Sequence, residues 1–265
     1  MMTTVQMPEP LAIAMQQAVA LLHNSRRPLL ISHPRPDGDT VGSALALPLA
    51  LIHLGKTPQL ACIHPIPEAL AYLPGATAYQ NAIPEDDAPD LVVAVDLSDL
   101  NRSGGIYREA WRGKFPLLVI DHHETNEHFG DVNLVDPTAA ATALPLTALI
   151  DALGVPLDGA MATCLLAAVL TDTRGLRTAN TSPEVLRFVG RLIEAGGDYA
   201  GVMEKTLDSI PYQQMRAWGV ALENLRLDGA LAWTTFPLAE KLSLGIADHD
   251  DLDLGNLISR WPKQR

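Results

Sequence analysis

The chain has 265 residues, of which 48% are hydrophobic and 19% are charged, and this composition excludes disordered and fibrous proteins. Its 31 acidic residues outnumber the 19 basic ones, so the formal net charge of −12 argues against a protein that coats long nucleic acid through a basic surface. The two cysteines, Cys62 and Cys164, are too few for a disulfide framework or a thiolate metal site, which favours a reducing compartment.

The first residues do not have the pattern of a secretory signal peptide, because no basic cluster precedes an apolar stretch. The longest apolar run covers residues 44–54, contains Pro48 and His53, and falls well short of the ~20 residues that a membrane span requires. We therefore expect a cytoplasmic protein without a membrane partner.

The first 120 residues alternate between helical and strand patterns. Apolar residues recur at helical spacing over residues 10–24, and four short apolar runs of strand length follow, separated by segments that can hold helices. These runs cover residues 28–31, 57–63, 91–95 and 116–120. Strands that are apolar throughout and alternate with helices predict a parallel sheet covered on both faces, so the predicted fold class is α/β.

The rest of the chain is predicted to be mainly helical and to end in a hairpin. One of these helices has clear start and stop signals: Ser182 is its predicted N-cap, a proline follows directly, and paired glycines come just after its end. The predicted helices cover residues 137–153, 158–170, 182–195, 198–208 and 211–223. The Asp228-Gly229 pair between two apolar segments predicts a β-hairpin, and the acidic segment 248–253 is predicted to be a solvated loop.

Ionisable residues follow three of the predicted strands within two residues. His33 follows the first strand, Asp96 the third, and the triplet Asp121, His122 and His123 the fourth. A single residue of this kind often caps a helix or closes a turn. Because ligands of open parallel sheets bind at the carboxyl ends of the strands, the three together favour a binding site.

The segment after the first strand adds two carboxylates, Asp37 and Asp39, on either side of Gly38. We expect the glycine to allow an unusual backbone angle, so that the carboxylates reach two neighbouring ions. The alternative is that Asp39 caps the following helix. Asp172, at the end of an apolar helical run, is a further candidate. Histidine and aspartate ligands suit Mn²⁺, Mg²⁺, Fe²⁺ or Zn²⁺, and the surplus of oxygen donors favours Mn²⁺ or Mg²⁺.

In order and setting, these clusters resemble the four motifs of the DHH phosphoesterase superfamily. The segments HPRPDGDTVGSALAL, DHHETNEHFGDVNLVDPTAAAT and TDTRGLRTANTS are most similar to its bifunctional oligoribonuclease (nano-RNase) and 3′-phosphoadenosine 5′-phosphate (PAP) phosphatase branch, related to RecJ-type exonucleases. The resemblance covers about residues 10–245. It implies a hydrolase with two Mn²⁺ ions, or Mg²⁺ in their place, that acts on short nucleotides.

The resemblance also implies roles for individual residues. Asp121 would orient a histidine, and His123 would face the substrate phosphate as a donor or proton carrier, so both, with Asp96, form the expected catalytic group. Arg102 would assist in substrate binding, although a surface salt bridge is the simpler explanation for it. Six residues would bind the metals: His33 and Asp37 one ion, Asp39, His122 and Asp172 the other, and Asp96 both.

A hydroxide held between two cations is a nucleophile at neutral pH, so no covalent intermediate is needed. The resemblance thus implies a phosphodiesterase that releases 5′-mononucleotides from short oligonucleotides, with further action on PAP or on linear or cyclic dinucleotides. One alternative is an inorganic pyrophosphatase or exopolyphosphatase of the same superfamily, which would need a basic C-terminal cradle, whereas only four basic residues follow residue 227. The other is a metal-binding fragment with weak catalysis.

Three domains are predicted: a catalytic DHH domain (1–185), a helical connector (186–223) and an incomplete, smaller α/β DHH-associated substrate-binding domain (224–265). Family members carry a glycine-rich motif ending in histidine in the last of these, and the Gly-Gly pairs of this chain, at 104–105 and 196–197, are not followed by histidine. The expected partners are short oligonucleotides or small nucleotide phosphates, not long duplexes. A homodimer is left open.

Overall fold

The computed structural model describes residues 8–84, 87–229, 231–246, 252 and 254–259. The chain divides into two compact units, Met1–Asp208 and Ser209–Arg265. The division into three domains stays a prediction.

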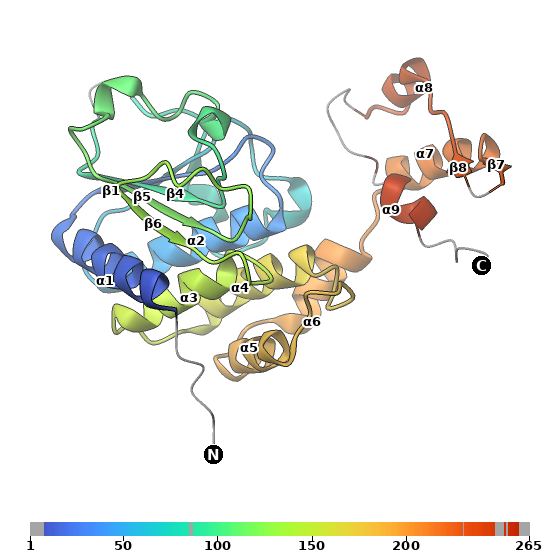
Figure 1. Cartoon of the computed structure of the whole chain (residues 1–265). Coiled ribbons are helices and arrows are strands. Elements are labelled where there is room, and N and C mark those ends of the chain that lie inside the picture. The colour runs from blue at the N-terminus through green and yellow to red at the C-terminus, as the bar shows by residue number, and fades with distance from the viewer. Residues whose placement is uncertain (1–7, 85–86, 230, 247–251, 253, 260–265) are drawn as a thin grey trace. The chain divides into compact units, whose positions relative to one another are not determined.

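The first unit is built on a six-stranded sheet in which all neighbouring strands are parallel, in the order β3-β2-β1-β4-β5-β6 (Figure 1). The strands are β1 (Pro28–Ile31), β2 (Gln59–Ala61), β3 (Tyr79–Gln80), β4 (Leu91–Val95), β5 (Leu117–Asp121) and β6 (Val132–Val135). The predicted α/β class is confirmed, and β1 and β4 have the predicted bounds.

The sequence does not predict the two edge strands, β3 and β6. β3 has only two residues, too few for any periodic pattern. β6 contains Asn133, whose side chain forms two hydrogen bonds with the backbone of Gly130 and therefore resembles a turn residue in the sequence.

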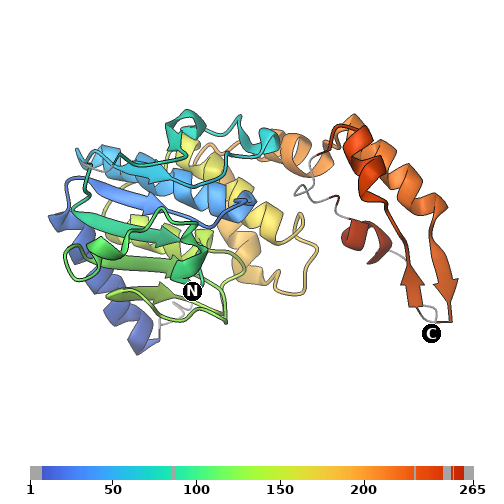
Figure 2. The same ribbon diagram turned by 90° about the horizontal axis from the view of Figure 1, so that it is seen from above.

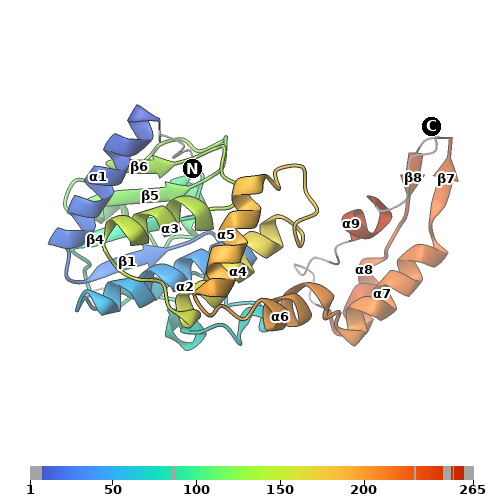
Figure 3. The same ribbon diagram turned by 90° about the horizontal axis from the view of Figure 1, so that it is seen from below.

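Helices cover one face of this sheet, and Figure 3 shows α1, α2 and α3 lying across it. The helices are α1 (Glu9–Asn24), α2 (Gly38–His53), α3 (Ala143–Ala152), α4 (Gly159–Asp172), α5 (Pro183–Glu194) and α6 (Tyr199–Val202). Alternate strand residues, among them Leu30, Val93 and Ile120, pack into the core beneath the helices. Leu29 and its equivalents face the other way and pack against loops and short 3₁₀ turns around Trp111.

Two predicted helices differ from those observed. The helix predicted over residues 137–153 begins only at Ala143, and residues 137–142 form turns. The helix predicted over residues 198–208 consists of α6 and a π-helical turn, Met203–Asp208.

The second unit contains a hairpin of two antiparallel strands, β7 (Arg226–Asp228) and β8 (Leu231–Trp233), which Figure 2 shows side by side. This confirms the hairpin predicted around Asp228 and Gly229. Its helices are α7 (Tyr212–Glu223), α8 (Leu238–Ser243) and α9 (Leu254–Ser259). Of the predicted acidic loop 248–253, only Leu252 is described, and it is buried in a small core of this unit. No helix within the described parts of the chain is long and apolar enough to cross a membrane.

Candidate metal centre

The six predicted metal ligands meet with His123 at the carboxyl edge of the sheet. They form three groups in which the candidate ligand atoms lie within 4.8 Å of one another. The groups are His33, Asp37 and Asp96; Asp39, His122 and Asp172; and Asp96, His122 and His123. Because Asp96 and His122 each belong to two groups, the three groups form one continuous cluster.

Asp37 and Asp39 come from the first turn of α2 and face different partners. Asp37 is the N-cap of α2, and its Oδ1 accepts a hydrogen bond from the backbone N–H of Thr40 at 3.0 Å. The alternative that Asp39 caps this helix is therefore wrong. The carboxylate of Asp39 instead accepts hydrogen bonds from the backbone N–H groups of Thr142 (2.7 Å) and Ala143 (3.3 Å), at the N-terminus of α3.

The expected role of Gly38 needs a correction. Gly38 is absent from the glycines with positive φ, so it supplies no unusual backbone angle. A Cβ at Gly38 would lie 2.3 Å from Oγ1 of Thr171, and one at Gly42 would lie 2.2 Å from the carbonyl oxygen of Cys164. The two glycines thus let α2 approach α4 closely, which brings Asp39 near Asp172.

Asp96 lies between the starts of α2 and α3. Its backbone is left-handed, with φ of +55°, directly after β4. Its Oδ2 accepts a hydrogen bond from the hydroxyl of Thr40 at 2.5 Å, and its Oδ1 accepts one from the hydroxyl of Thr142 at 2.9 Å. The side chain is 2% exposed, so these two hydroxyls fix the carboxylate within a buried site.

Backbone carbonyl groups orient two of the candidate histidine ligands. Nδ1 of His33 lies 2.9 Å from the carbonyl oxygen of Pro34, and Nδ1 of His122 lies 3.2 Å from that of Ala139. For His122, donation from Nδ1 leaves Nε2 as the nitrogen with a free lone pair, whereas Nε2 of His33 also lies 2.6 Å from the hydroxyl oxygen of Thr40. Nε2 of His33 lies 3.7 Å from Asp96, and Nε2 of His122 lies 3.6 Å from Asp172 and 3.7 Å from Asp39.

Asp121 orients His123 rather than His122. Its Oδ1 lies 2.7 Å from Nδ1 of His123, and its Oδ2 accepts a hydrogen bond from the amide of Asn126 at 2.6 Å. The side chain of Asp121 is fully buried, whereas that of His123 is 41% exposed. The hydrogen bond to Asp121 raises the pKa of His123 to about 9. His123 therefore presents a cationic ring at the exposed side of the cluster.

The electrostatics of the cluster fit a divalent cation. Burial, and then the charges of Asp96 and Asp172, raise the pKa of Asp39 well above its usual range. Burial raises the pKa of Asp172 to about 6, although His122 opposes the shift. Such shifts arise because burial disfavours the charged carboxylate and neighbouring carboxylates repel it. The donor set of imidazole nitrogen and carboxylate oxygen suits Mn²⁺, Mg²⁺, Fe²⁺ or Zn²⁺.

Arg102 lies outside this cluster, in the 3₁₀ turn Leu100–Ser103. It is exposed, and its Nη1 donates a hydrogen bond to Oγ of Ser98 at 3.2 Å. Within the described parts of the chain it forms no ion pair, so the surface salt bridge weighed as an alternative is not observed there.

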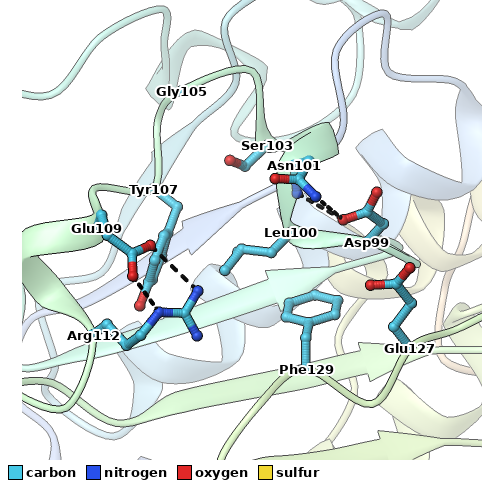
Figure 4. Close-up of a pocket in the computed structure, with 10 residues that line it drawn as sticks. All are labelled: Asp99, Leu100, Asn101, Ser103, Gly105, Tyr107, Glu109, Arg112, Glu127 and Phe129. Carbon is cyan, nitrogen blue, oxygen red and sulfur yellow. Dashed lines mark hydrogen bonds and ion pairs between the residues drawn. The ribbon is translucent and has the colours of Figure 1, made fainter.

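A cavity of about 360 Å³ lies beside this turn (Figure 4). It is lined by Leu100, Tyr107 and Phe129 and by an ion pair between Glu109 and Arg112. None of the residues of the three ligand groups lines it.

Sequence reasoning misses Thr40, Thr142 and Asn126, which hold the carboxylates of Asp96 and Asp121. Each is uncharged, and only tertiary structure brings Thr142 to Asp96. Their position in the sequence is the signal that could have found two of them. Thr40 directly follows Asp39, and Asn126 stands five residues after Asp121.

The chain is similar to known proteins over the part that carries these residues. The family model of the DHH family, N-terminal domain, matches residues 28–169. The bifunctional oligoribonuclease and PAP phosphatase NrnA of Thermus thermophilus is 36% identical over 196 residues, which are 74% of this chain and 58% of that protein. A protein of Streptococcus mutans, named "Probable bifunctional oligoribonuclease and PAP phosphatase NrnA", is 24% identical over 74% of this chain and 61% of its own length.

Among solved structures, an exopolyphosphatase-related protein from Bacteroides fragilis is similar in fold, with a TM-score of 0.83. The match covers 94% of this chain and 75% of that protein at 19% identity. At this identity the similarity shows the fold alone. The chain covers less than two thirds of the two NrnA proteins.

Proposed function

The chain belongs to the DHH family, and we propose that it is a metal-dependent phosphoesterase that hydrolyses short oligonucleotides to 5′-mononucleotides. The proposal includes PAP as a second substrate and two Mn²⁺ ions, or Mg²⁺ in their place. The substrate classes come from the name of the Thermus relative, which is 36% identical. The cytoplasmic location stays a prediction, and a homodimer stays open.

The sharing of Asp96 between two ligand groups is the observation that carries this proposal. The group of His33 and Asp37 includes Asp96, and Asp96 also groups with His122, which belongs to the group of Asp39. A carboxylate between two groups of ligands is the arrangement that two adjacent cations require.

When bound, two cations would supply a hydroxide nucleophile and offset the charge of the phosphoryl oxygens. The ligands would be His33, Asp37, Asp39, Asp96, His122 and Asp172, as the family resemblance implies. Asp121 would hold Nδ1 of His123, so that Nε2 of His123 donates to a phosphate oxygen or gives a proton to the leaving oxygen. Arg102, which is exposed and held by Ser98, would bind a further phosphate.

The assay that tests this proposal uses the full chain with Mn²⁺ on four substrates: a ribodinucleotide, PAP, a cyclic dinucleotide and pyrophosphate. We expect 5′-mononucleotides from the ribodinucleotide, and AMP and phosphate from PAP. Hydrolysis of pyrophosphate alone would replace the proposal with the pyrophosphatase alternative.

Metal analysis of the same sample separates the remaining outcomes. Bound Mn²⁺ without turnover of any substrate would support the catalytically weak fragment. A chain that binds no Mn²⁺ would overturn the metal centre itself.

A further inference from the structure

The loop that joins His33 to Asp37 contains a strained turn. Arg35, midway between these two proposed ligands, has a left-handed backbone with φ of +56°. This region is sparsely populated by residues other than glycine, and Arg35 also precedes Pro36, which favours extended backbone at the preceding residue. An unfavoured conformation of this kind persists only where surrounding contacts hold it.

The segment that follows β2 supplies those contacts. The thiol of Cys62 donates a hydrogen bond to the carbonyl oxygen of His33 at 3.2 Å. The backbone N–H of Arg35 donates one to Nδ1 of His64 at 3.0 Å. Of these two bonds, only the one to His64 is made by the strained residue itself.

We propose that His64 is a positioning residue for metal binding, because its Nδ1 holds the left-handed turn at Arg35 and so sets the spacing of His33 and Asp37. His64 belongs to none of the three ligand groups, and the hydrogen bond occupies the lone pair of Nδ1. The inference rests on the proposed function, which supplies the metal.

The expected consequence is confined to one of the two ions. His33 and Asp37 group together with Asp96, whereas Asp39, His122 and Asp172 form a separate group to which the loop contributes no ligand. Without the hydrogen bond, Arg35 would relax toward extended backbone and the ligands of the first group would lose their preset spacing. Mn²⁺ would then bind more weakly at that group, because part of the binding free energy would be used to order the loop.

Titration of the full chain with Mn²⁺ by calorimetry tests this inference. We expect His64→Ala to weaken one of two Mn²⁺ sites about tenfold and to leave the other unchanged. His64→Asn should stay within about threefold of the wild type, because the amide oxygen of asparagine can accept in place of Nδ1. His53→Ala, which removes a half-exposed histidine of α2 outside the centre, is the matched control.

A double-mutant cycle with Arg35→Gly isolates the mechanism, because glycine adopts the left-handed turn without strain. In that background His64→Ala should cost less than about threefold. Should His64→Ala fail to fold, as judged by circular dichroism, His64→Gln takes its place, because its longer side chain displaces the acceptor.

The outcomes separate this inference from the proposed function. Equal Mn²⁺ affinity of the wild type and His64→Ala, or His64→Gln in its place, would overturn the positioning role. The same loss with and without Arg35→Gly would also overturn it. A wild-type chain that binds no Mn²⁺ would overturn the proposed function instead.

Discussion

Asp172 illustrates how a candidate cation site would destabilise the metal-free protein. Burial raises its pKa to about 6, against an ordinary value of 3.8. Between these two values the folded chain binds more protons than the unfolded chain, so the stability of the metal-free protein falls as the pH rises from about 4 to about 6. Since the side chain is 31% exposed, we expect a loss of about 2 kcal/mol, below the ~3 kcal/mol that the full shift would give.

Asp172→Asn should therefore stabilise the metal-free chain at pH 7, by about 1 to 2 kcal/mol, because it removes the unfavourable buried charge. It should also flatten the dependence of stability on pH between 4 and 6. Urea denaturation in the presence of a chelator measures both effects, with Glu204→Gln, an exposed acid, as the control. A variant no more stable than the wild type would contradict the prediction.

The two candidate ligands Asp96 and Asp37 should differ in how many ions depend on them. Asp96 belongs to two ligand groups and Asp37 to one. We therefore expect metal analysis to find that Asp96→Ala loses both Mn²⁺ ions, whereas Asp37→Ala retains one. If both variants lose the same number of Mn²⁺ ions, Asp96 is not shared between two ions.

The sequence predicts the charged residues of the candidate site better than it predicts the residues that hydrogen-bond to them. Asp96 and His122 are predictable because ionisable residues follow three of the predicted strands, and ligands of open parallel sheets bind at the carboxyl ends of the strands. Which histidine Asp121 orients is not predictable, because it depends on the backbone path of two adjacent residues after β5. Thr142 is missed because it reaches Asp96 only when α3 docks against α2.

At the scale of elements, the close packing of α2 on α4 decides where the carboxylates meet. Gly42→Ala would place a Cβ 2.2 Å from the carbonyl oxygen of Cys164, so the helices must separate. We expect a loss of about 3 kcal/mol in the free energy of unfolding, because a backbone atom cannot turn aside as a side chain can. The matched substitution Gly190→Ala, within α5, meets no atom within 4 Å and should stabilise by about 0.5 to 1 kcal/mol.

Chemical denaturation of both glycine variants checks this pair. Equal stability would mean that the contact between the two helices relaxes freely. Since the contact also positions Asp39 and Asp172, Gly42→Ala should weaken Mn²⁺ binding as well.

The elements that the sequence predicts well are those whose patterns reflect burial. β1 and β4 are apolar throughout because both faces of the sheet are covered, and their bounds are predicted correctly. The predicted start of α3 is too early, because the apolar composition of residues 137–142 hides the turns that present Thr142 to Asp39. Tertiary contacts decide where α3 begins, and the local sequence pattern does not predict these contacts.

At the scale of the whole molecule, the net charge of −12 becomes consistent with a phosphate substrate once the site is considered. Two divalent cations would add four positive charges to the metal-loaded chain, which gives −12 + 4 = −8. The surface would stay acidic while the centre attracts phosphate. With the proposed cations bound, this arrangement would disfavour long nucleic acid and admit short substrates.

The two units should also differ in their ability to fold alone. The buried residues of both large core clusters among the described residues lie within residues 14–202, and all three ligand groups lie within residues 33–172. The core described in the second unit has only three buried residues, Ala217, Ile246 and Leu252, which is too few to stabilise a domain of its own. We therefore expect a fragment of residues 1–208 to fold, to unfold within a few degrees of the full chain's main transition, and to bind as many Mn²⁺ ions. Calorimetric unfolding and Mn²⁺ titration check this, and a fragment that folds but binds fewer ions would show that the second unit contributes to the metal centre.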